Sequence, residues 1–224
     1  MALLAAVLLA AACAPLSDLG LDTRPIFIDQ PIDATSRGRL LHATATPEQC
    51  TAWLAAAGIG FRPVADRIED TFCQVSGAGA LIDTPQGDAR LSPAKPMMAC
   101  PLAAAMALWR RQSVEPAARE ILGAEVREID HLGVYACRNV NNQADGRPSA
   151  HARAEAIDVA GFRLSNGLRV TVAKDWAGES PQARFLHRIH DDACHLFGTT
   201  LSPDYNALHA NHLHLESGPP GACS

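Results

Sequence analysis

Six cysteines, spread between residues 50 and 223, limit the fold of this chain more than any other part of its sequence. No two of them form a CxxC pair, so neither a zinc ribbon nor a thioredoxin-type redox site is indicated. Oxidised pairs are typical of exported proteins, and an even number of cysteines therefore predicts three disulfides. The sequence leaves the connectivity open, with buried free thiols as the alternative for some of the six. They are Cys50, Cys73, Cys100, Cys137, Cys194 and Cys223.

A seventh cysteine, Cys13, ends an apolar segment over residues 1–13 that reads MALLAAVLLAAAC. The segment is too short for an ordinary transmembrane helix but fits the apolar part of a secretory signal, although no Lys or Arg precedes it. A cysteine after small residues is typical of lipoprotein signals, in which Cys13 would carry a lipid anchor to the membrane. An ordinary signal peptide, or a start codon chosen too far downstream, is the alternative. We therefore expect export to the periplasm or outer membrane of a Gram-negative bacterium.

Composition and pattern predict one globular domain after this segment. Of the 224 residues, 48% are hydrophobic and 19% charged, which is typical of a folded chain. The net charge is -5 and the arginines are scattered, so no nucleic-acid partner is expected. Residues 14–45 contain Pro, Asp and Ser without a sustained period and are predicted to be a linker. The domain is expected over residues 46–224, with no internal repeat.

The predicted elements define an α+β fold, with a small antiparallel sheet flanked by helices and held together by disulfides. The capping residue Thr46 begins a helix that ends near Gly58. Asn166-Gly167 is the strongest hairpin signal in the chain. Further helices are expected from Pro101, from near Glu115 and over residues 180–197. Strands are expected around residues 125–138 and 209–217, and residues 146–164 are expected to run from a loop into a strand.

Histidine and aspartate side chains form the most distinctive pattern. His151 precedes Asp158 by seven residues, and His209, His212 and His214 follow as HxxHxH. On a strand His212 and His214 point to one face, whereas His209 reaches that face only if the chain bends before His212. Catalytic zinc uses such nitrogen and oxygen ligands and leaves one position for water.

Further groups could complete a reaction centre. Hydrolysis of a peptide bond needs an activated water, a base and a positive group for the developing oxyanion. Tyr135 and Arg138 stand just before the first segment, and Glu216 shares the face of His214 if the strand continues. Histidines are more often structural residues, and His187, His190 and His195 are interpreted in that way. The sequence therefore predicts a zinc site built from two distant segments.

The ordered motifs resemble a known group of enzymes. SxHxxxxAxD followed by HxxHxH is similar to the zinc peptidases of the lysostaphin, D-Ala-D-Ala metallopeptidase and hedgehog (LAS) fold. Within that group the chain most resembles the bacterial extensin-like C-terminal domain family, from about residue 46 to the end. The resemblance rests on CPLAAAMALW, VYACR, SAHARAEAIDVAGF, the DW of AKDW, ACHLFG and SPDYNALHANHLHLE.

This resemblance implies a role for each residue that matches the family's motifs. It makes His151, Asp158 and His214 the ligands of Zn²⁺. It places His212 beside the metal as a group that stabilises the transition state or holds the site. His209 stands where penicillin-insensitive murein endopeptidases also have His, and it would act as the base. The resemblance makes Arg138 an oxyanion- or carboxylate-binding group. Ser149 would orient the loop or a ligand.

The resemblance also implies an activity and leaves a rival open. A zinc-dependent peptidase would act on peptidoglycan stem peptides or cross-links, as an endopeptidase or as a D,D- or L,D-carboxypeptidase. Related enzymes commonly have Gly where Ala154 or Glu155 falls, which puts catalysis in question more than metal binding. The alternatives are a non-catalytic zinc-containing lipoprotein domain that binds the cell wall, and a structural lipoprotein that acquires metal adventitiously.

Overall fold

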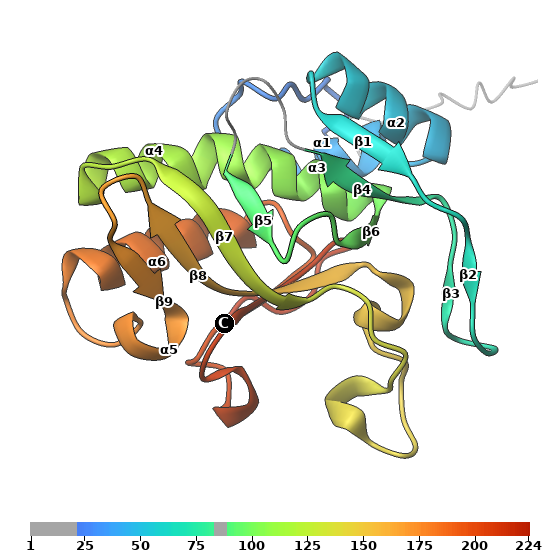
Figure 1. Ribbon diagram of the computed structural model, residues 1–224. Helices are drawn as coiled ribbons and strands as arrows, with labels where there is room; N and C mark the ends of the chain where they lie inside the picture. Colours follow the sequence, from blue (N-terminus) through green and yellow to red (C-terminus); the bar gives the residue numbers. More distant parts are fainter. Residues whose placement is uncertain (1–21, 83–88) are drawn as a thin grey trace, which may run out of the picture.

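A computed structural model describes residues 22–82 and 89–224 (Figure 1). The predicted signal segment 1–13, with Cys13, lies outside the described residues. The main sheet has the strand order β10-β11-β8-β7-β5, and β9 pairs with β8. Its pairs are antiparallel except for β5 with β7. The strands are β5 (Arg90–Ser92), β7 (Val126–Gly133), β8 (Ala156–Leu164), β9 (Arg169–Thr171), β10 (Thr199–Leu201) and β11 (Leu213–Glu216).

Two helical runs cover one face of this sheet (Figure 1). Phe162 of β8 packs against Trp109, with ring centroids 6.2 Å apart, and against Phe185, at 5.1 Å. Trp109 ends α3 (Cys100–Trp109), and Phe185 belongs to the amphipathic helix α6 (Pro181–Cys194). These fully buried aromatic rings form the centre of a single core, which confirms the predicted α+β class.

The helices expected from Pro101 and from Glu115 form one continuous run in the structure. After α3 the chain continues through a π-helical turn, Arg110–Val114, into α4 (Glu115–Ala117), and then through a second one, Ala118–Leu122. Proline lacks the N–H that an α-helix interior requires, so a sequence pattern reads Pro116 as a boundary. The wider turns before and after Pro116 accommodate it without ending the helix.

A β-bulge in β8 decides which side chains face the core. Asp130 and His131 of β7 are consecutive, but their partners on β8 are Gly161 and Val159, so Ala160 is an extra residue. Ile157 and Val159 on one side of this bulge and Phe162 on the other are all fully buried. If these residues alternated regularly, with Ala160 paired and no bulge, Asp158 would lie on the face of Phe162. The bulge therefore separates the aspartate from the core.

A second layer lies at the N-terminal end of the described chain. It contains α1 (Ser36–Ala43), α2 (Pro47–Ala56) and a three-stranded sheet of β1 (Gly60–Pro63), β4 (Ala78–Ile82) and β6 (Met97–Ala99). A separate hairpin pairs β2 (Arg67–Ile68) with β3 (Gln74–Val75). Thr46 caps α2 through a capping box, as its sequence predicts. A short helix α5 (Val172–Asp175) follows β9 in the main body.

The prediction of a linker over residues 14–45 is wrong for its described part, residues 22–45. Residues 36–43 form α1, and Ile26 and Leu40 are buried in the core. The Arg37 side chain donates hydrogen bonds to the carbonyl oxygens of Cys194 and Phe197. The short, polar helix has no clear apolar stripe in the sequence, because its fit depends on these tertiary contacts.

The three expected disulfides are present. They join Cys50 to Cys100, Cys73 to Cys137 and Cys194 to Cys223. Among the residues that the structure describes, no helix has the length and apolar character needed to cross a bilayer.

Candidate metal centre

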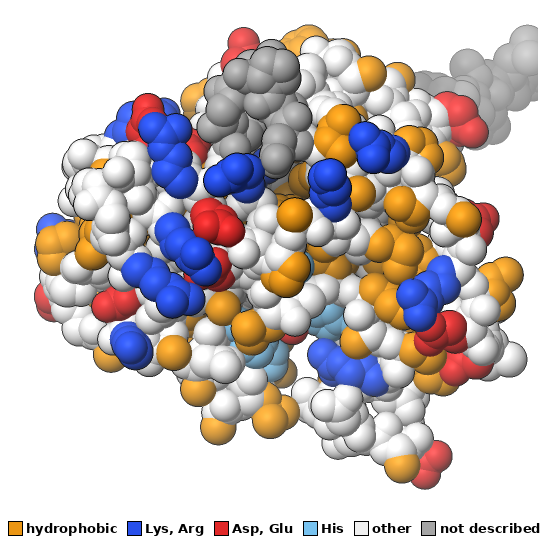
Figure 2. Space-filling model, viewed as in Figure 1, with side chains coloured by type: hydrophobic (Ala, Val, Ile, Leu, Met, Phe, Trp, Pro, Cys, Tyr) orange, Lys and Arg blue, Asp and Glu red, His pale blue; other side chains and the backbone are white. Residues whose placement is uncertain are grey.

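All six predicted site residues line one cavity of about 530 Å³: Arg138, His151, Asp158, His209, His212 and His214. One wall is the connection between β7 and β8, and the other is the connection between β10 and β11 together with Gly221 and Ala222 of the C-terminal segment. Figure 2 shows histidine side chains in a hollow of the surface, with arginine or lysine side chains beside them. The two distant segments of the sequence therefore meet in one cleft.

Strand pairing positions the first two groups. Asp158 of β8 lies directly opposite His214 of β11 in the antiparallel register, so their side chains share a face. His151 reaches them from a 3-10 turn, Ala150–Arg153, that precedes β8. Ser149 begins this turn and accepts a hydrogen bond from the His151 backbone N–H. Ala154 ends the turn with φ 55°, in the left-handed region that glycine adopts more readily.

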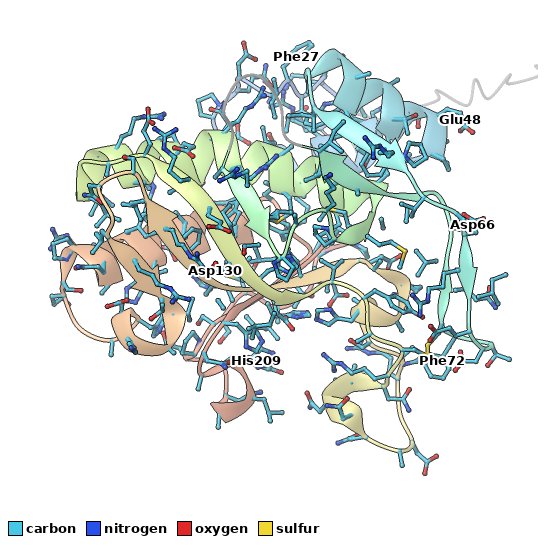
Figure 3. The ribbon with its side chains drawn as sticks, viewed as in Figure 1. Phe27, Glu48, Asp66, Phe72, Asp130 and His209 are labelled. Atoms are coloured by element: carbon cyan, nitrogen blue, oxygen red, sulfur yellow. A yellow bond between two sulfur atoms is a disulfide. The ribbon has the colours of Figure 1, made fainter. Side chains whose placement is uncertain are left out.

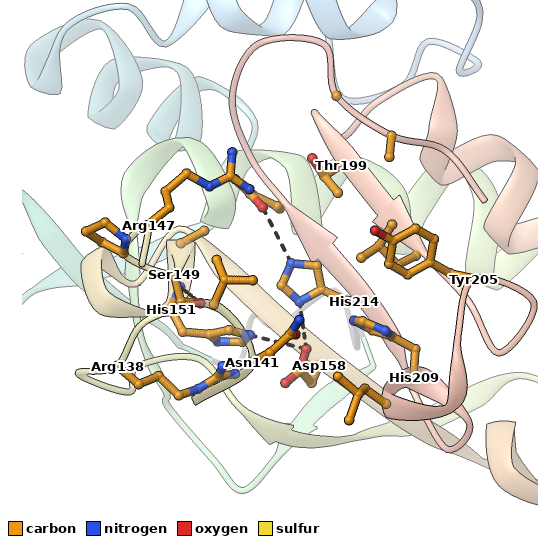
Figure 4. A pocket seen from close by; sticks show the side chains of 18 of the residues that line it. Arg138, Asn141, Arg147, Ser149, His151, Asp158, Thr199, Tyr205, His209 and His214 are labelled. Atoms are coloured by element: carbon orange, nitrogen blue, oxygen red, sulfur yellow. Dashed lines mark hydrogen bonds and ion pairs between the residues drawn. The ribbon is translucent and has the colours of Figure 1, made fainter. Parts of the chain in front are cut away.

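Three imidazole nitrogens converge on one carboxylate oxygen. Asp158 Oδ1 lies 2.9 Å from His214 Nδ1, 3.2 Å from His151 Nε2 and 3.5 Å from His212 Nε2. Ligand atoms about 2.1 Å from a tetrahedral zinc ion lie about 3.4 Å from one another. The three oxygen-to-nitrogen separations are close to this value, and the ligand atoms of His151, Asp158 and His214 all lie within 4.8 Å of one another (Figure 4).

The second nitrogen of each of these rings faces an oxygen. His151 Nδ1 lies 2.8 Å from the Val134 carbonyl oxygen, and His212 Nδ1 lies 2.8 Å from Asn211 Oδ1. His214 Nε2 lies 3.5 Å from Glu216 Oε2. A neutral imidazole that donates its one N–H outward presents a lone pair inward. Three lone pairs would then surround the Asp158 oxygen, an arrangement that requires a proton or a metal ion between them.

Burial and charge set the protonation of this cluster in the absence of a metal. Burial raises the pKa of Asp158, but hydrogen bonds from His151 and His214 lower it more, so the carboxyl remains ionised. Burial lowers the pKa of His214, whereas Asp158 and Glu216 raise it, with a net value of about 9. A proton on His214 thus balances the carboxylate, and a metal ion has to displace that proton.

His209 faces this cluster because the chain bends before β11. It ends a 3-10 turn, Ala207–His209, and its ring centroid lies 5.1 Å from that of His212 and 5.9 Å from that of His214. Figure 3 shows it on the connection between β10 and β11, and it lines the cleft. Asn206 Oδ1 accepts a hydrogen bond from His209 Nδ1 at 2.8 Å.

Burial and the neighbouring histidines keep the His209 ring neutral. Burial, followed by the charges of His212 and His214, lowers the pKa of His209 to about 4. Burial also lowers the pKa of His212. At neutral pH both rings are therefore uncharged, and His209 Nε2 is free to accept a proton.

The structure separates the two residues of the GVYACR segment. Arg138 lines the cleft, facing the cluster from the β7–β8 side (Figure 4). Tyr135 does not line it: the Arg67 guanidinium lies 4.6 Å from the centre of its ring. Tyr135 therefore supports the β2–β3 hairpin and takes no part in the site.

Two other groups of potential ligands are present among the described residues. His190 lies near Cys194 and Cys223, and Asp70 near Cys73 and Cys137. Each group contains both sulfur atoms of a disulfide, and a cysteine binds metal as a free thiolate. These groups therefore offer no complete donor set, which distinguishes the cluster of His151, Asp158 and His214.

Sequence reasoning missed the residues that orient the histidines. Neither Asn206 nor Asn211 has a role among the residues that the sequence singles out. The spacing NxxH for His209 and the adjacent Asn before His212 are the signals that could have indicated them. The Val134 carbonyl and the C-terminal wall of the cleft carry no such signal, because they depend on the folded backbone.

Fold and site together define the class of this protein: an α+β domain whose cleft presents histidine and aspartate side chains as a candidate metal centre. The chain belongs to the family described as extensin-like protein C-terminus, which matches residues 48–224. No curated protein and no solved structure matches the chain.

Proposed function

We propose that this protein is a zinc-dependent peptidase of the bacterial cell envelope that cuts peptides of peptidoglycan. The observation that supports it best is the convergence of three imidazole nitrogens on Asp158 Oδ1, with each second nitrogen facing an oxygen acceptor. This is the usual environment of histidines that bind zinc. The resemblance to LAS-type peptidases and the expected export signal support the substrate and the compartment.

In this proposal His151, Asp158 and His214 hold the metal. When bound, zinc activates water for attack on a carbonyl carbon and polarises the carbonyl oxygen. Neutral His209 accepts a proton at Nε2, which no described residue engages, and its ring is oriented for this by Asn206. Arg138 supplies positive charge for the developing oxyanion, and His212, whose Nε2 lies 3.5 Å from Asp158 Oδ1, helps to hold the site beside the metal.

Metal content and hydrolysis test the two parts of the proposal separately. The protein, purified without a histidine tag, is expected to contain one zinc per chain and to cut crosslinked muropeptides, with activity lost on adding a chelator. Asp158→Ala should lose the metal. His209→Ala should keep the metal but lose about 100-fold or more in kcat, as expected for removal of a general base.

His42→Ala provides the matched control, because His42 is exposed on α1 outside the cleft and should change neither readout. Stoichiometric zinc without product from any muropeptide would refute the peptidase and favour a zinc-containing domain that binds the cell wall. Zinc that persists in Asp158→Ala would show that the metal is held elsewhere.

A further inference from the structure

The connection between β7 and β8 is a hairpin that presents two arginines to the cleft. The Ser149 N–H donates to the Arg138 carbonyl, and the Val140 N–H donates to the Arg147 carbonyl. Asn139 and Pro148 form the bridge between these bonds. In such a ladder Arg138 and Arg147 point to one face as diagonal neighbours, with Cα atoms about 7–8 Å apart. That face is turned to the cleft, which both residues line.

These guanidinium groups have no anion within the described part of the chain. Neither the Arg138 nor the Arg147 side chain forms an ion pair or hydrogen bond there. Arg153, a third arginine lining the cleft, differs because it pairs with Glu155 at 2.8 Å. Placing two like charges close together on one face is unfavourable unless a negative group joins them.

The position of the pair relates it to the candidate metal centre. Arg138 and Arg147 lie on one side of the cluster, and Tyr205 and His209 lie on the opposite side (Figure 4). A peptide held across the metal would thus extend one end toward the arginines. Arginine binds carboxylates through parallel N–H donors, and two of them can hold one carboxylate between them.

The resemblance already implies an oxyanion- or carboxylate-binding role for Arg138; we propose that Arg147 joins it in an anion subsite that selects peptides carrying a free carboxylate close to the bond that is cut. The inference rests on the proposed peptidase function and adds a substrate requirement to it. Arg147 is then a specificity-determining residue: it contacts the substrate anion and takes no part in bond cleavage. The carboxylate can be the end of the peptide or an acidic side chain, since both offer the same group to the arginines.

Four forms of one crosslinked muropeptide distinguish these sources: all carboxylates free, the terminal one amidated, the side-chain ones amidated, and both amidated. Binding to the zinc-loaded His209→Ala protein is measured by titration calorimetry, and kcat/KM is measured with the wild type. We expect amidation of one of the two kinds of carboxylate to weaken binding and to lower kcat/KM, each about 10- to 100-fold, which is the effect of losing a charge-assisted hydrogen bond. The form with both kinds amidated should show the same loss.

Arg147→Gln should reduce binding and kcat/KM for the free carboxylate form by a similar factor, and should remove the difference between free and amidated forms. Arg147→Glu should weaken them further, because it places a negative charge in the subsite. Arg153→Gln is the matched control and should preserve the discrimination, since Arg153 already has Glu155 as its partner.

The outcomes separate this inference from the function on which it rests. Carboxylate-dependent binding that requires Arg147, without cleavage of any form, would support the subsite and refute the peptidase. Cleavage of free and amidated forms with equal efficiency would overturn the subsite and leave the peptidase intact. Absence of binding to every form would overturn the subsite as well.

Discussion

The oxygens behind the imidazole rings distinguish this cleft from a chance gathering of histidines. Each of the four rings has one nitrogen beside an oxygen acceptor, supplied by Val134, Asn206, Asn211 and Glu216. Such partners fix the tautomer and the direction of the free nitrogen. A histidine in a mobile surface loop would have to lose rotational freedom each time it bound a metal or took a proton.

Asn206→Ala tests whether orientation matters for His209. The variant removes the acceptor of His209 Nδ1 and also the acceptor of the Leu208 N–H. We expect kcat to fall about 10- to 100-fold with zinc content unchanged, as is typical when a supporting hydrogen bond is lost. Steady-state kinetics and metal analysis of the same preparation measure both.

Asn206→Asp serves as the rescue, since a carboxylate oxygen can accept both hydrogen bonds. Its kcat should lie well above that of Asn206→Ala. Equal kcat in both variants and the wild type would exclude an orienting role for Asn206.

The sequence predicted which histidine and aspartate residues meet in the cleft better than it predicted their surroundings. Alternation along β11 was sufficient to place His212 and His214 on one face. The bend that turns His209 toward them was left open, because it depends on the 3-10 turn that Asn206 caps. Arg147 carried no signal, because its importance comes from the hairpin register with Arg138.

At the scale of elements, the backbone of the C-terminal segment packs directly against Gly198, which lies between α6 and β10. A Cβ atom at Gly198 would lie 2.5 Å from the Pro219 carbonyl oxygen and 2.7 Å from that of Gly218. Both obstacles are backbone atoms, which a small side-chain movement cannot remove. The segment after Gly218 includes Gly221 and Ala222, which line the cleft.

Gly198→Ala is therefore expected to lower the free energy of unfolding by about 1–3 kcal/mol, the usual cost of overpacking. Chemical denaturation measures it. Gly38→Ala is the matched control: Gly38 lies in α1 with nothing within 4 Å of the added Cβ, and alanine favours helix. It should raise the unfolding free energy by up to about 1 kcal/mol. Destabilisation by Gly38→Ala but not by Gly198→Ala would contradict the packing described above.

Elements with a local cause were predictable, and elements with a tertiary cause were not. The capping box of α2 and the turn at Asn166-Gly167 depend on residues close together in the sequence, and both are present. The bulge at Ala160 has no such signature. It is evident only from the pairing of β8 with β7, although it determines on which face Asp158 lies.

For the molecule as a unit, the pattern of predicted helices and strands indicated the α+β class, and the number of cysteines predicted three disulfides. Their partners could not be predicted, because the choice depends on which distant segments pack together. The structure attaches α2 to the start of α3 and the β2–β3 hairpin to the wall that carries Arg138. The segment before α2 was mistaken for a linker because its contacts are likewise long-range.

The disulfide order has a consequence for how the protein matures. Cys50 pairs with Cys100 across the intervening Cys73, which itself pairs beyond Cys100 with Cys137. If the protein is exported, as proposed, and its thiols oxidise in order of emergence, Cys50 would join Cys73, and Cys100 would join Cys137. Both bonds are non-native and must be reshuffled by thiol exchange. We expect a disulfide isomerase to raise the yield of protein with the three native disulfides, which peptide mapping measures. An equal yield of native pairing without the isomerase would contradict this expectation.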